Sequence, residues 1–165
     1  MYRKSQKDME IDKEKLIELC DQIKAKLIEK GKTRFIVKVA ESNEELKESV
    51  SLDEAELEEL EYKYYDEALD TDTRLAMYDC GGYYRELQMD GVVIENDTLY
   101  FYLTETYEDD NGIDDQETYK EDIDGFLDPR AWWMSGGGEL EFRPKEILEF
   151  YLSMLSDEVS EFGFI

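Results

Sequence analysis

The spacing of apolar residues changes from a helical period to an alternating one and back again along the chain, and this change restricts the fold most. A stripe with helical spacing lies between about residues 12 and 30 and consists of Leu16, Cys20, Ile23 and Leu27. A second stripe follows Pro144, a residue that suits the first turn of a helix, and consists of Ile147, Leu148, Tyr151 and Leu155. The sequence therefore predicts a helix near each end of the chain, the first capped by Asp12 and closed by Gly31.

Between these helices, residues 74–107 are typical of β-strands. Runs at 92–94 and 98–103 flank Glu95-Asn96-Asp97, which predicts a hairpin with a three-residue loop. Residues 83–87, followed by a turn at Asp90-Gly91, predict the preceding strand of a meander.

Two further strands are predicted over residues 34–39 and 139–142, the second after a turn at 135–138. In the first, alternation places Phe35, Val37 and Val39 on one face. Residues 105–124 contain few large apolar side chains and predict a loop. The pattern indicates an α+β fold, with helices on one face of a mainly antiparallel sheet. We expect one domain over residues 1–165, with 1–9 as a flexible tail.

A further helix is predicted over residues 51–69, because Ser51 and Glu54 have the spacing of a capping box. A similar signal predicts a short helical turn within 41–50. The apolar stripe of this further helix would be Leu57, Leu60, Tyr64 and Ala68. Its opposite, solvated side would carry Glu56, Glu58, Glu59 and Asp66. Tyr62 and Tyr65 lie off the buried stripe, and tyrosine is favoured at protein interfaces.

Composition excludes several classes of function. The chain has 44 Asp+Glu against 19 Lys+Arg, no histidine and a net charge of −25 at pH 7. Direct binding to nucleic acid or to an anionic membrane is not expected, because phosphates would be repelled. Without histidine there is no Ser-His or Cys-His nucleophile and no histidine-ligated metal.

The cysteines and the hydropathy pattern indicate a cytoplasmic protein. Cys20 and Cys80 form no CxxC motif and are predicted to be reduced thiols in the core. The basic N-terminal residues are not followed by the apolar segment of a secretory signal, and no run reaches the length of a membrane span.

Motifs for metal binding and catalysis are incomplete. Around Gly112, the EF-hand register would place Tyr107 at the first ligand position and Thr118 at the last, so it fails. A solvated loop is the preferred interpretation, although a looser carboxylate site for Ca²⁺ or Mg²⁺ stays open. Trp132 and Trp133 could line a cleft beside an acid, but packing in the core and over the sheet edge is preferred. We expect neither enzymatic activity nor a cofactor.

The negative charge is concentrated in two segments. Residues 41–72 have a net charge of −12 and residues 105–124 of −9, whereas residues 1–40 have +4. Charge that served only solubility would be spread evenly, and concentrating it raises self-repulsion. A directed acidic surface is therefore favoured over general solubility.

Clustered carboxylates suggest imitation of a nucleic acid. Acids three or four residues apart on a helix lie about 5–6 Å from each other, similar to successive phosphates. Duplex DNA carries one charge per about 1.7 Å, so the whole charge matches roughly 40 Å of duplex, about the diameter of a compact chain of this length. The natural partner is a protein with a basic nucleic-acid-binding cleft. The predicted partner-binding residues are Glu44, Glu45, Glu48, Glu56, Glu58, Glu59, Tyr62, Tyr65, Asp66, Asp109, Asp110, Asp114 and Asp115.

In size, in lacking catalytic residues and in clustering acid at 41–72 and 105–124, the chain resembles the small acidic anti-defence proteins of phages and mobile elements. Among these are anti-restriction and anti-CRISPR DNA mimics. The resemblance implies an inhibitor, in the host cytoplasm, that occupies the DNA-binding cleft of a defence nuclease. The alternative is an immunity protein that neutralises a toxin, such as a basic nuclease. A toxin gene immediately upstream would favour immunity, and phage structural genes nearby would favour anti-defence. A regulator that binds a metal or a small molecule is a third class.

Overall fold

The computed structural model describes residues 12–37, 73–79, 81–112, 114–126 and 139–156. In chain order the elements are α2 (Lys13–Glu29), β1 (Arg34–Ile36), β2 (Arg74–Asp79), β3 (Tyr83–Glu95), β4 (Thr98–Asp109), β5 (Asp114–Glu121), α5 (Ile123–Phe126), β6 (Glu139–Phe142) and α6 (Pro144–Ser156). Several predictions fall outside the described residues: the tail 1–9, the helical turn in 41–50, the helix 51–69, the turn at 135–138, and the positions of Val39, Cys80, Trp132 and Trp133.

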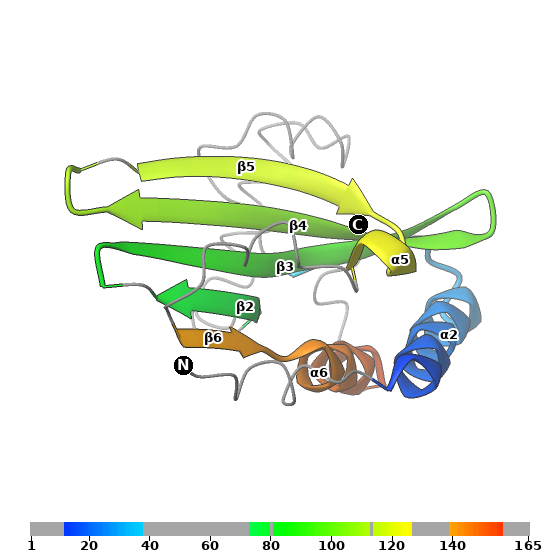
Figure 1. The fold of residues 1–165 in the computed structure, drawn as a ribbon. Coiled ribbons are helices and arrows are strands. Elements are labelled where there is room, and N and C mark those ends of the chain that lie inside the picture. The colour runs from blue at the N-terminus through cyan, green and yellow to red at the C-terminus, as the bar shows by residue number, and fades with distance from the viewer. Residues whose placement is uncertain (1–11, 38–72, 80, 113, 127–138, 157–165) are drawn as a thin grey trace, which may run out of the picture.

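The strands form one antiparallel sheet in the order β5-β4-β3-β2-β6, and β1 pairs with β3 next to β2. Figure 1 shows β3, β4 and β5 as long strands side by side, with α2 and α6 toward one end of them. The β2–β3 and β4–β5 connections lie at the opposite end of the sheet (Figure 1). The predicted α+β class, with helices and a mainly antiparallel sheet, is confirmed.

Both predicted terminal helices form as their local signals indicate. Asp12 caps α2, its Oδ1 accepting a hydrogen bond from the Lys15 amide at 3.1 Å. Gly31 ends this helix with φ +69°, a conformation that a glycine adopts without strain. All residues of the two predicted apolar stripes are buried, and Leu19 joins the first.

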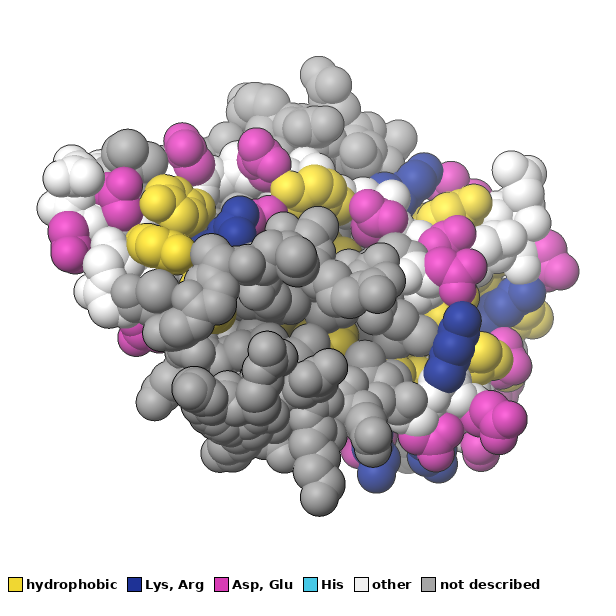
Figure 2. Space-filling view, viewed as in Figure 1, with side chains coloured by type: hydrophobic (Ala, Val, Ile, Leu, Met, Phe, Trp, Pro, Cys, Tyr) yellow, Lys and Arg dark blue, Asp and Glu magenta, His cyan; other side chains and the backbone are white. Residues whose placement is uncertain are grey.

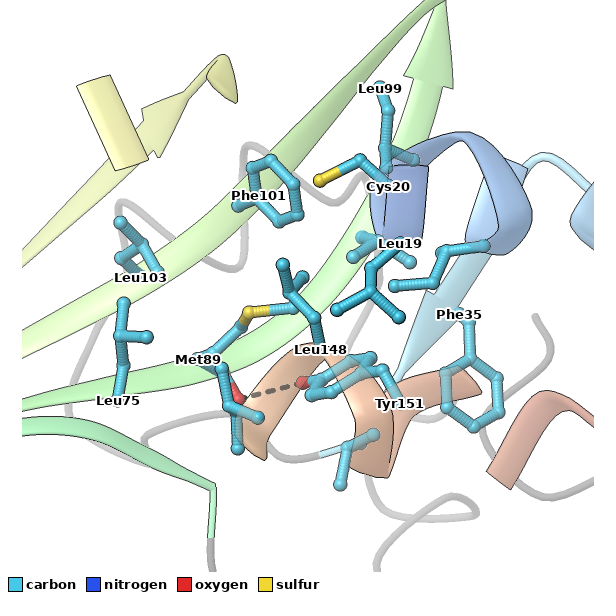
Figure 3. Packing of buried hydrophobic residues seen from close by; sticks show 14 of the residues in the cluster. Leu19, Cys20, Phe35, Leu75, Met89, Leu99, Phe101, Leu103, Leu148 and Tyr151 are labelled. Atoms are coloured by element: carbon cyan, nitrogen blue, oxygen red, sulfur yellow. Dashed lines mark hydrogen bonds between the residues drawn. The ribbon is translucent and has the colours of Figure 1, made fainter. Parts of the chain in front are cut away.

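The core lies between these two helices and one face of the sheet. Helix residues such as Leu148 pack with Met89 and Phe101 of the long strands (Figure 3). The Tyr151 hydroxyl donates a hydrogen bond to the Met89 carbonyl at 2.7 Å, and burial raises the pKa of Tyr151 well above its usual value. Cys20 is a buried free thiol, as predicted, and burial together with Asp21 raises its pKa to about 12.

The predicted turn at Asp90-Gly91 is wrong. β3 runs without interruption through both residues, with a register shift between Met89 and Gly91 where it pairs with β4. The Asp90 side chain is buried and accepts hydrogen bonds from Gln88 and Thr104. A glycine is required at 91 because a Cβ there would lie only 2.7 Å from the Phe35 carbonyl oxygen.

In β1 and the residue after it, Phe35 and Val37 both join the core cluster while Ile36 is buried outside it, which agrees with the prediction that Phe35 and Val37 share one face. One strand prediction needs a smaller correction. The β3–β4 loop has two residues, not three, because Glu95 pairs directly with Thr98. Asn96 and Asp97 have φ of +50° and +65°, as a tight hairpin turn requires.

The loop predicted over residues 105–124 is also wrong, and this correction matters most for function. β4 continues to Asp109, and β5 returns from Asp114 to Glu121 along its full length. The side chains of this segment are mostly polar, so apolar burial does not account for the strands. They form because the backbone of β4 pairs with β3 and that of β5 pairs with β4. Most of the acidic residues of this segment therefore stand on a paired β-hairpin.

Candidate protein-binding surface

The outer half of the β4–β5 hairpin, residues 105–117, contains seven Asp or Glu and no Lys or Arg. The predicted residues Asp109, Asp110, Asp114 and Asp115 come together here, around the turn that joins the two strands. The other predicted partner-binding residues lie outside the described residues: Glu44, Glu45, Glu48, Glu56, Glu58, Glu59, Tyr62, Tyr65 and Asp66.

Hydrogen bonds from backbone amides to side-chain and backbone oxygens hold this turn in place. Asp109 Oδ1 accepts a hydrogen bond from the Asn111 amide at 2.9 Å, and Gly112 follows with φ +85°. The Asp110 amide donates to the Gly82 carbonyl at 3.1 Å, which ties the β4–β5 turn to the β2–β3 turn. In that second turn, Asp79 Oδ1 accepts from the Gly81 amide at 3.1 Å. The two turns therefore form one connected end of the sheet.

Strand register brings acidic residues from four strands into one row. Asp79 pairs with both Glu139 of β6 and Tyr84 of β3, Tyr84 pairs with Glu108, and Glu108 pairs with Asp114. Adjacent strands lie about 4.7–4.9 Å apart, so the row spans about 19 Å. We call the residues of this row and the adjoining turn the acidic sheet end: Asp79, Glu108, Asp109, Asp110, Asp114, Asp115 and Glu139.

Tyrosines border the acidic sheet end. The rings of Tyr83 and Tyr107 have their centroids 5.8 Å apart, and the Tyr78 ring lies 6.1 Å from that of Tyr83. The Arg85 guanidinium lies over the Tyr107 ring, 5.9 Å from its centroid, and its Nη2 is 3.1 Å from a Glu105 carboxylate oxygen. One basic side chain is thus held between a ring and a carboxylate.

Two glutamates face each other just inside the acidic sheet end. Glu105 and Glu117 are directly opposed, a placement that costs stability for like charges. The Tyr119 hydroxyl lies between their carboxylates, 2.9 Å from Glu105 Oε2 and 2.7 Å from Glu117 Oε2. Burial raises the pKa of Tyr119, and its bonds to the two glutamates raise that pKa further. This neutral hydroxyl offsets the repulsion between the two glutamates.

Figure 2 shows the surface character of this region. At the end of the sheet away from α2, hydrophobic side chains lie beside a basic side chain, with several acidic side chains around them. Asp79, Glu108, Asp110 and Asp115 are exposed, whereas Tyr83, Tyr84 and Tyr107 are half-buried. Acidic and aromatic groups therefore share one exposed region.

Within the part of the chain that the structure describes, no group of three or more Asp, Glu or Cys residues is arranged to hold a metal ion. None of the helices in these described ranges is both long and apolar enough to cross a membrane.

Sequence reasoning missed part of this surface, namely Asp79, Tyr83, Tyr84, Glu108 and Glu139. The successive tyrosines Tyr83 and Tyr84 in the predicted strand 83–87 were a usable signal, because neighbouring strand residues face opposite sides and place one tyrosine on each. The row itself carries no sequence signal, because its members come from segments as distant as residues 79 and 139.

Comparison of the chain with protein-family models, with curated proteins and with solved structures found no match. The chemistry of the acidic sheet end is therefore the main indication of function.

Proposed function

We propose that the chain is a non-catalytic inhibitor that binds the basic nucleic-acid-binding cleft of a host defence nuclease, where it takes the place of DNA. The observation that carries the proposal is the strand register that places Glu139 opposite Asp79 and Glu108 opposite Asp114, with Tyr84 between the two acidic pairs in the same row.

The row presents acidic residues to a cleft lined by arginine and lysine. Its four acidic positions span about 19 Å as two neighbouring pairs with Tyr84 between them, a mean spacing of roughly 6 Å compared with 3.4 Å between the charges of a single DNA strand. Strand pairing fixes the backbone at these positions, so the backbone needs no ordering at the moment of binding. Asp110 in the adjoining turn is exposed as well, and Asp115, also exposed, pairs with Tyr107 and lies on the opposite face of the sheet from the row.

The electrostatic repulsion within the acidic sheet end supports the same conclusion. Like charges brought together on neighbouring strands repel one another and destabilise the fold. A basic partner would remove this repulsion on binding, and the long-range attraction would speed association. Direct binding to nucleic acid would add to the repulsion instead.

The test compares two variants of equal charge. In D79N/E108Q/D110N/D115N the exposed acids of the acidic sheet end lose their charge. In the control E14Q/E18Q/D21N/E29Q, four exposed acids of α2 lose theirs. Both changes remove four negative charges, so each variant has a net charge of −21 in place of −25.

The assay measures release of a labelled duplex from restriction nucleases and from CRISPR effector complexes. Wild type and the α2 control should release the duplex from at least one of these enzymes, and the sheet-end variant should need at least about tenfold more protein. Release should weaken steeply with salt. If the wild type releases no duplex, or if both variants act alike, the proposed function is wrong.

A further inference from the structure

We draw no further inference here: the strongest candidate, the group of buried side chains of Ile36, Val93 and Tyr102 on the sheet face away from α2 and α6, carries none, because nothing in the part of the chain that the structure describes shows what covers it.

Discussion

At Gly91 the backbone of β3 approaches β1 more closely than any side chain allows. A Cβ at this position would lie 2.7 Å from both the Phe35 carbonyl oxygen and Ile36 Cδ1. The residue before it, Asp90, is 1% exposed and accepts hydrogen bonds from Gln88 and Thr104. An acid and a glycine thus stand in the middle of the sheet for reasons of packing and hydrogen bonding.

Gly91→Ala should destabilise the protein by about 1–3 kcal/mol, because β1 must move to admit the methyl group. Gly82→Ala is the matched control: the nearest atom to its added Cβ would be Asp110 Oδ2 at 3.8 Å. We expect the control to change the free energy of unfolding by less than about 0.5 kcal/mol. Urea unfolding of both variants measures the difference in the free energy of unfolding. Equal effects would show that the close approach to β1 is not what excludes a side chain at position 91.

Among the elements, the β4–β5 hairpin contains opposed acidic residues and, beside them, groups that reduce the repulsion between their carboxylates. Glu105 and Glu117 oppose each other. The Tyr119 hydroxyl contacts both carboxylates, and the Arg85 guanidinium pairs with Glu105. The inner part of the same hairpin is anchored in the core by Phe101 and Leu103. The hairpin can therefore carry acid at its outer half because its inner half is buried.

Tyr119→Phe should lower the free energy of unfolding by about 1 kcal/mol, because it removes a hydrogen bond to a carboxylate. The effect is smaller than for a fully buried hydrogen bond to a charged group, because this site is partly exposed. In a Glu117→Gln background the same change should cost less, since one of the two opposed charges is gone. Tyr100→Phe, on β4, serves as the control and should have little effect. Thermal unfolding of the four-member cycle measures the coupling, and a coupling of zero would contradict the role given to this hydroxyl.

Across the whole molecule, positive and negative side chains are concentrated in different regions of the chain. Described residues 12–37 have seven Lys or Arg and five Asp or Glu, whereas residues 105–117 have seven acids and no base. Lys13 pairs with Asp124 of α5 at 3.4 Å and Lys24 with Asp97 of the β3–β4 turn at 3.0 Å, so two lysines of α2 contact acidic residues next to the sheet. These contacts offset only a small part of the net charge of −25.

Salt should therefore stabilise the protein and weaken the proposed complex with a basic partner. Raising the ionic strength from about 0.01 M to 1 M shortens the screening length from about 30 Å to 3 Å. The free energy of unfolding at neutral pH should rise by an amount of the order of 1 kcal/mol, because repulsion between carboxylates is screened. The rise should be smaller in D79N/E108Q/D110N/D115N. A fall in stability with salt would mean that ion pairs, not repulsion, dominate.

How much the sequence could predict differs between local and long-range features. The helix of residues 13–29 could be predicted because its cap, its closing glycine and its apolar stripe are all local. The strands around the tight turn at Asn96 and Asp97 were predictable for a similar reason, although the length of the loop was not. The strand character of residues 105–121 was hidden, because polar residues there are stabilised by pairing with distant segments.

By itself, therefore, the sequence determined the α+β class, the two terminal helices, the buried stripes and the large negative charge. Only the tertiary structure decided where part of that charge stands. Asp79, Glu108 and Glu139 are distant along the chain, and strand pairing places them in one row. The physical reason is that helix signals act within a few residues, whereas the register of a sheet depends on backbone hydrogen bonds between segments that meet only after folding.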